Sequence, residues 1–146
     1  MPASGIKLLD ANVWLALAFG DHRHHGQAKV WFSSQTDASC ALCRITQMAL
    51  LRHLTNSRIM GKFVQSQQSA WSIYDALSGD PRVIFLHEPP GLDSTFRRFA
   101  NLSASGLERW ADAYLASFAD ISHSQLVTFD QGFNRFTGLD LLVLQS

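Results

Sequence analysis

Short apolar runs alternate along the chain with longer segments in which apolar residues recur at helical spacing. The short runs, rich in Leu, Ile and Val, have the length and composition of buried strands and cover residues 6–9, 38–42, 83–86, 126–129 and 141–144. Spacings of three and four residues predict helices over residues 13–19, 25–33, 45–56, 65–78, 92–101 and 107–119. Because strands that alternate with helices form parallel sheets covered by helices, the pattern predicts an α/β fold with five short parallel strands.

The length and composition indicate one globular domain that covers residues 1–146. Hydrophobic residues make up 47% of the chain and charged residues only 16%, so a hydrophobic core is expected and disorder is excluded. Pro89-Pro90-Gly91 is interpreted as a turn and not as a linker, and no internal repeat is present. The high apolar content also favours a partner that covers part of the surface.

Neither a membrane span nor an export signal is expected. The longest strongly apolar run, Val13 to Phe19, is much shorter than the ~20 residues that cross a bilayer. The chain also lacks the basic and then apolar opening of a secretory signal, so a cytoplasmic protein is predicted.

The net charge is zero, with 12 Lys and Arg against 12 Asp and Glu. The whole-molecule field therefore offers no attraction for a phosphate backbone, and any attraction for RNA must come from local groups. Three basic clusters are candidates for this attraction, and each could instead be an ordinary solvated surface. They are Arg23-His24-His25, the group Arg52, His53, Arg58 and Lys62, and Arg97-Arg98.

Cys40 and Cys43 form the only C-x-x-C pair of the chain. A structural zinc site needs two further Cys or His ligands at similarly tight spacing, and the alternative ligands considered are the clustered histidines of the polar segment His22 to His25. Reduced, buried thiols are therefore expected in place of a zinc site.

Asp10 and Asp130 each follow an apolar strand run. In a doubly wound sheet, ligands bind beyond the carboxyl ends of the strands, where the strand order reverses. If the first and fourth strands are neighbours, both carboxylates emerge at that edge. The alternatives are that Asp10 only caps the next helix and that Asp130 only begins the Asp-Gln-Gly turn.

Asp112 shares a helical face with Leu115, Ala116 and Ala119. A carboxylate on such an apolar face is costly unless it is paired, hydrogen-bonded or bound to a cation. Gln47 similarly begins an apolar stripe, and it is either a hydrogen-bonded core residue or a polar group beside the acids.

Carboxylates without Cys or His partners suit Mg²⁺ or Mn²⁺, so Asp10, Asp112 and Asp130 are the candidate metal ligands. The natural chemistry of such a site is phosphate-ester hydrolysis, in which the ion polarises the phosphoryl group and activates water. The chain contains no G-x-G-x-x-G, G-x-x-x-x-G-K-[ST], H-E-x-x-H or G-x-S-x-G motif.

Several motifs occur in a fixed order along the chain: Leu9-Asp-Ala-Asn-Val-Trp-Leu15, Asp21-His-Arg-His-His25, Arg44-Ile-Thr-Gln47, Trp110-Ala-Asp-Ala-Tyr-Leu-Ala116 and Leu126-Val-Thr-Phe-Asp130. Together they resemble the VapC-type PIN-domain ribonuclease toxins. The resemblance covers residues 6 to 144. It implies a five-stranded parallel PIN sheet, Mg²⁺- or Mn²⁺-dependent cleavage of RNA, and inhibition by a cognate VapB-type antitoxin.

The resemblance also assigns roles to single residues. Asp10, Asp112 and Asp130 match acidic positions of the family, whereas the acid usual on the helix after the second strand is replaced here by Gln47. An amide can still coordinate a metal through oxygen, but the lost charge should weaken metal binding. Arg44 and Asn12 are candidate contacts to substrate phosphates, and Thr128 is a candidate hydrogen-bond donor to a ligand carboxylate.

Two alternatives belong to other functional classes. One is a binding module that keeps the fold and the antitoxin surface without catalysis, which Gln47 and the neutral charge would explain. The other is a phospho-accepting receiver domain, which also gathers Asp residues at the edge of a five-stranded α/β sheet. Receiver domains use a lysine after a late strand, and no lysine follows Lys62 here. Apolar helical stretches at 14–19, 48–54 and 71–77 could support a homodimer and receive an antitoxin segment.

Overall fold

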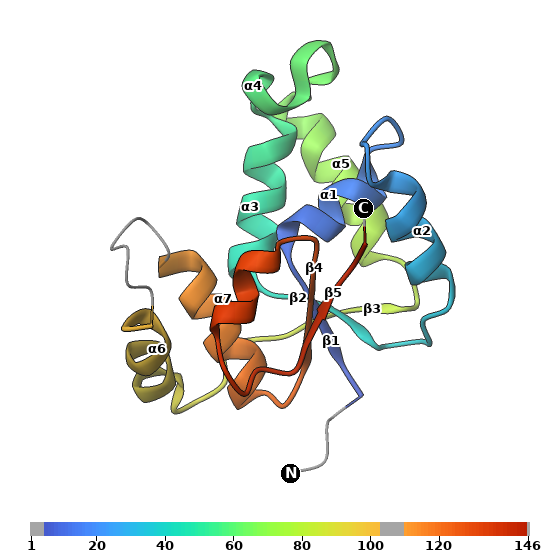
Figure 1. Ribbon diagram of the computed structural model, residues 1–146. Coiled ribbons are helices and arrows are strands. Elements are labelled where there is room, and N and C mark those ends of the chain that lie inside the picture. The colour runs from blue at the N-terminus through green and yellow to red at the C-terminus, as the bar shows by residue number, and fades with distance from the viewer. Residues whose placement is uncertain (1–4, 103–109, 146) are drawn as a thin grey trace.

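The computed structural model describes residues 5–102 and 110–145 (Figure 1). Its strands are β1 (Lys7–Leu9), β2 (Cys40–Leu42), β3 (Val83–Phe85), β4 (Gln125–Thr128) and β5 (Leu141–Val143). Its helices are α1 (Ala11–Ala18), α2 (His25–Ser33), α3 (Arg44–Leu54), α4 (Ser57–Met60), α5 (Gln67–Ser78), α6 (Leu92–Ala100) and α7 (Trp110–Ile121), with short 3-10 turns η1 (Gly61–Phe63) and η2 (Gln131–Arg135).

The five strands form one parallel sheet in the order β3-β2-β1-β4-β5, which confirms the predicted sheet. β1 lies in the middle, between β2 and β4. The chain first extends the sheet through β2 and β3 on one side of β1 and then returns to add β4 and β5 on the other. The strand order therefore reverses between β1 and β4, where a doubly wound sheet places its ligand site.

Neighbouring residues on each central strand point into different layers, as the period of two requires. Leu8 and Leu126 pack with α6 and α7, whereas Leu9 and Val127 pack with α1, α2, α3 and α5. Figure 1 shows α6 and α7 together on the side of the molecule away from α2. Trp14, in the layer of Leu9 and Val127, and Phe118, in the layer of Leu8 and Leu126, are almost fully buried. Each contributes roughly 2–3 kcal/mol through the burial of apolar surface.

The predicted elements are present, with differences at their ends. The helix at His25–Ser33 has the predicted bounds, and the last predicted helix continues to Ile121, while its predicted start at 107–109 lies outside the described residues. The short turns α4, η1 and η2 were not predicted. They are too brief to show a hydrophobic period, and α4 and η2 begin where Asn56 and Asp130 accept hydrogen bonds from backbone N–H groups.

Two other sequence expectations concern cysteine and membrane association. Cys40 and Cys43 are buried and form no disulfide, as expected. Among the described helices, none combines the length and the apolar character that a bilayer crossing requires.

Candidate active site

The site lies at the carboxyl edge of β1 and β4, which pair in parallel with Leu9 opposite Val127. Asp10 directly follows β1, and Asp130 comes two residues after Thr128, the last residue of β4. The predicted neighbourhood of the first and fourth strands is thereby confirmed. Both carboxylates emerge at the same edge of the sheet because the two strands run in the same direction.

Asp10 is held by two hydrogen bonds. The backbone N–H of Ala11 donates to Oδ1 over 2.7 Å, and the Thr128 hydroxyl donates to Oδ2 over 2.8 Å. Burial raises the pKa of Asp10 from its ordinary value of 3.8 to about 6, even though both hydrogen bonds lower it. The negative charges of Asp112 and Asp130 raise this pKa further, so the three carboxylates are electrostatically coupled.

Thr128 organises this part of the site. Its fully buried hydroxyl donates to Asp10 and accepts hydrogen bonds from the Asn12 side-chain amide at 3.2 Å and the Asp130 backbone N–H at 3.0 Å. One hydroxyl thus uses its donor and both acceptor positions. The predicted hydrogen bond from Thr128 to a site carboxylate is present.

Asn12 joins α1 to the end of β4. Its Nδ2 donates to Thr128, and its Oδ1 accepts from the backbone N–H of Phe129 over 3.3 Å. These contacts fix the start of α1 relative to β4. The substrate contact predicted for Asn12 is not tested by this geometry and stays a prediction.

Asp130 caps the short turn η2. Its Oδ1 accepts from the backbone N–H of Gly132 over 2.8 Å, and a Cβ at position 132 would lie 3.0 Å from that oxygen. Any larger residue at position 132 would therefore displace the carboxylate. The capping roles considered as alternatives in the sequence are also present, because Asp10 caps α1 and Asp130 begins the turn η2.

Asp112 lies in the first turn of α7 and is paired with a cation. Arg135 Nη2 lies 3.3 Å from Asp112 Oδ2, and Arg135 Nη1 donates to the Gly132 carbonyl over 2.6 Å. The guanidinium also covers the ring of Phe136, 4.3 Å from its centroid. Arg135 therefore links α7 to the turn that follows Asp130.

Sequence reasoning missed Arg135. The only signal was a cation one turn beyond the Asp-Gln-Gly turn, and that signal names no partner. Arg135 and Asp112 stand 23 positions apart, and no periodicity connects them.

Gln47 is buried in the first turn of α3, as its place on the apolar stripe predicted. Its Oε1 accepts from Arg44 Nη1 over 2.5 Å, and the Arg44 guanidinium lies 5.0 Å from the centroid of Phe85. The amide is thus a hydrogen-bonded core residue. Burial raises the pKa of the Cys43 thiol, and the charge of Asp10 contributes to this rise, so the start of α3 lies within the field of the acids.

The donor set suits a hard divalent cation, because carboxylate and amide oxygens are the ligands that Mg²⁺ and Mn²⁺ prefer. Burial is the main cause of the raised pKa of Asp10, and a cation would relieve both this burial of charge and the repulsion from Asp112 and Asp130. Within the described ranges, however, no three Asp, Glu, His or Cys side chains lie close enough as they stand to hold an ion. The acids fit the cation in chemistry, and their side chains would have to converge to bind it.

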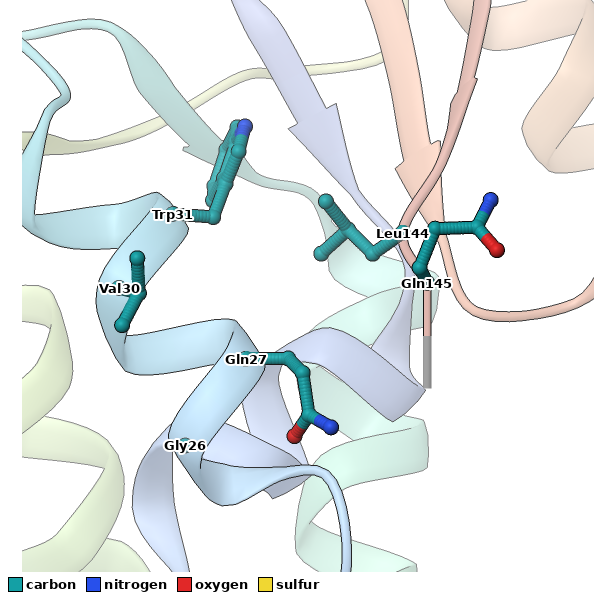
Figure 2. A pocket seen from close by; sticks show the side chains of 6 residues that line it. All are labelled: Gly26, Gln27, Val30, Trp31, Leu144 and Gln145. Carbon is teal, nitrogen blue, oxygen red and sulfur yellow. The ribbon is translucent and has the colours of Figure 1, made fainter.

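A separate apolar pocket lies between α2 and the chain after β5. Its volume is about 690 Å³, and Figure 2 shows Val30, Trp31 and Leu144 directed toward it. Its lining includes none of the predicted site residues. The pocket is therefore distinct from the acidic edge.

Comparison with known proteins identifies the family. Residues 7–139 match the PIN domain. The chain is 37% identical to Ribonuclease VapC41 of Mycobacterium tuberculosis, over 94% of this chain and 97% of that protein. It is 35% identical to Ribonuclease VapC29 of the same species, over 94% of both chains.

Solved structures share the fold. A crystal structure of Mycobacterium tuberculosis VapC20, described as a sarcin-ricin loop cleaving toxin, superposes with a TM-score of 0.69 at 15% identity, covering 92% of this chain and 97% of that one. VapBC-1 from nontypeable Haemophilus influenzae gives a TM-score of 0.67 at 21% identity, covering 94% and 97%. The five-stranded arrangement is thus that of the PIN domain.

Proposed function

The chain belongs to the VapC family of PIN-domain proteins, and from this membership we propose that it is a divalent-metal-dependent endoribonuclease and the toxin of a toxin–antitoxin pair. The observation that carries the proposal is the group of carboxylates that β1, β4 and α7 bring to one edge, where burial raises the pKa of Asp10 to about 6 and Asp112 and Asp130 add to this rise. Relatives with 35% and 37% identity over 94% of this chain carry the name ribonuclease.

Asp10, Asp112 and Asp130 are the proposed ligands of Mg²⁺ or Mn²⁺. When bound, the ion supplies a Lewis acid for the phosphodiester and lowers the pKa of the attacking water. Thr128 orients Asp10 by donating to Oδ2, which leaves Oδ1 on the side of the Ala11 N–H. Arg135 keeps Asp112 from turning away from the edge.

The remaining predicted residues, Arg44, Gln47 and Asn12, are proposed to contact the substrate or to add to the metal site. Arg44 is exposed at the start of α3, and its guanidinium is proposed to contact a phosphate while it holds the Gln47 oxygen. Gln47 adds an oxygen without a charge, so we expect weaker metal affinity than a site with a fourth carboxylate would show. Asn12 is proposed to contact substrate in addition to joining α1 to β4.

A catalytically silent binding module is the second candidate. Gln47 and Asp112 are both hydrogen-bonded to arginines, and such contacts would compete with a metal for these oxygens. The receiver-domain alternative is not retained, because the chain is a PIN domain over residues 7–139.

The proposed partners are RNA, a VapB-type antitoxin and a second copy of the chain. In the stretch at 14–19, Trp14, Leu15 and Ala16 are buried and belong to the core, so only the partly buried residues 17–19 could contribute to a docking surface. Met48 on α3 and Trp71 on α5 remain half-exposed, at 54% and 48%, and they are the proposed homodimer contact. The open pocket at Trp31 is the proposed seat for an apolar antitoxin side chain. A cytoplasmic location is proposed with these partners.

The deciding experiment is cleavage of total RNA by purified, antitoxin-free protein with Mg²⁺, with Mn²⁺ and with EDTA. The test variant is Asp10→Asn/Asp112→Asn, and the matched control is Asp75→Asn/Asp93→Asn, which changes two exposed carboxylates. We expect metal-dependent cleavage by the wild type and the control, and none by the test variant. Folded wild-type protein that leaves RNA intact under every metal would favour the binding module.

A further inference from the structure

The segment Asp21–His25, which follows α1 and ends at the first residue of α2, lies against the active-site edge. The His24 ring is stacked on Phe129, with centroids 4.6 Å apart and planes inclined by 16°. Phe129 directly precedes Asp130, and its backbone N–H donates to Asn12. The stack therefore holds the histidine-rich segment next to the strand end that positions the acids.

Hydrogen bonds within the segment determine which ring nitrogens carry protons. Arg23 Nε donates to His24 Nε2 over 3.1 Å, and the His24 backbone N–H donates to His22 Nδ1 over 3.0 Å. Since an accepting imidazole nitrogen has no proton, His24 Nδ1 and His22 Nε2 carry the N–H groups. Within residues 5–102 and 110–145, neither group nor the terminal nitrogens of Arg23 have an acceptor. Apart from the exposed Asp21 carboxylate, the side chains of Arg23, His22 and His24 thus present free N–H donors.

The Arg23 side chain of the segment is also without an ion pair, although Asp21 lies two residues before it. Arg82, Arg97 and Arg98 are ion-paired with carboxylates, whereas no described carboxylate lies within ion-pair distance of Arg23. Burial lowers the pKa of His22, and the neighbouring His24, Arg23 and His25 lower it further. An anion beside these groups would relieve their repulsion.

We propose that Asp21–His25 binds a phosphate of the RNA backbone next to the bond that is cut. This inference rests on the proposed ribonuclease function and adds a substrate subsite to it. Arg23 supplies the charge, and the N–H groups of His22 and His24 supply directed hydrogen bonds. A neutral chain needs such a local group, because its overall charge does not attract RNA.

Binding is measured by fluorescence anisotropy of a labelled single-stranded RNA oligonucleotide, in an Asp10→Asn background that does not consume it. Arg23→Gln should weaken binding about fivefold and reduce the slope of log K against log salt by about 0.7, the value for one phosphate contact on a single strand. His24→Phe keeps a ring on Phe129 but removes the N–H donor, and it should weaken binding about threefold.

The matched controls change the same residue types elsewhere. Arg97→Gln alters an exposed arginine on α6, and His123→Asn alters a histidine before β4, at the opposite edge of the sheet. Both should leave RNA affinity unchanged, and every variant should keep the unfolding midpoint of its Asp10→Asn parent. With Asp10 restored, the same variants should keep the wild-type Mn²⁺ affinity. The parent's RNA affinity and salt slope in both Arg23→Gln and His24→Phe would overturn the inference.

Competition by inorganic phosphate tests whether the segment binds the RNA backbone or any small anion. We expect phosphate to compete with RNA only weakly, and competition as strong as that of unlabelled RNA would overturn the assignment to the backbone. The two levels of the proposal fail differently. A wild-type protein that neither binds nor cuts RNA contradicts the ribonuclease, whereas normal cleavage with unaffected Arg23 and His24 variants contradicts only the subsite.

Discussion

The two halves of the acidic edge hold their polar side chains by different means. In the strand half, Asp10 and Asp130 accept hydrogen bonds from a buried hydroxyl and from backbone N–H groups. In the helix half, Asp112 and Gln47 are bonded to arginines. Neutral donors fix a carboxylate without cancelling its charge, whereas an arginine compensates charge and competes with a metal. The strand half therefore fixes the positions of its carboxylates and keeps their charge, whereas in the helix half arginines occupy the side-chain oxygens.

The largest effect expected from this difference is the cost of ionised Asp10. The pKa near 6 in the folded protein exceeds the ordinary value of 3.8, so stability is lost as the pH rises between these two values. Asp10→Asn should raise the free energy of unfolding by up to about 3 kcal/mol at about pH 8 and by about 1 kcal/mol at about pH 4.5. Urea denaturation at the two pH values measures this, with exposed Asp75→Asn as the control. An equal gain at both values would contradict the pKa shift.

Thr128→Val tests whether neutral hydrogen bonds hold the strand half together. The change keeps the shape of the side chain but leaves the Asn12 amide and the Asp130 N–H without their acceptor. We expect a loss of about 2 kcal/mol in the free energy of unfolding and a further rise in the pKa of Asp10. Thr137→Val, at an exposed position, is the control for chemical denaturation. If both variants unfold alike, the network carries no stability.

Gln47→Glu adds a carboxylate to the helix half. Arg44 would offset part of the new charge, and we expect Mn²⁺ affinity to increase about tenfold, which equals about 1.4 kcal/mol. Titration calorimetry measures this effect, and Gln27→Glu, exposed on α2, adds the same charge away from the acids. The same gain in both variants would show that only net charge matters.

The smallest effect is expected for Arg135→Gln. The ion pair with Asp112 is partly exposed, with side-chain exposures of 24% and 28%, and such pairs contribute little free energy. Removing the cation should raise Mn²⁺ affinity by about 0.5 kcal/mol, while RNA cleavage falls because Asp112 is less well positioned. Calorimetry and cleavage rates are compared with those of Arg97→Gln. Unchanged cleavage would remove Arg135 from the list of positioning residues.

Much of the strand half was predictable. Asp10 and Asp130 follow apolar runs, and a parallel sheet brings such residues to one edge, so their proximity depended only on β1 and β4 being neighbours. Thr128 was predicted as a donor because it ends the same strand. The helix half was less predictable. The helical spacing identified Gln47 as buried and placed Arg44 one turn before it, but nothing in the spacing indicated that Arg135 would pair with Asp112.

The alternation of strands and helices, the capping residues and the acids after the strands belong to the sequence, because period and turn chemistry act over a few residues. The meeting of Thr128 with Asp10 spans 118 positions, and that of Arg135 with Asp112 spans 23. Only the packed sheet decided these pairs, and with them the burial that raises the pKa of Asp10. Desolvation and charge pairing depend on the distance between side chains in space, which a pattern along the chain does not specify.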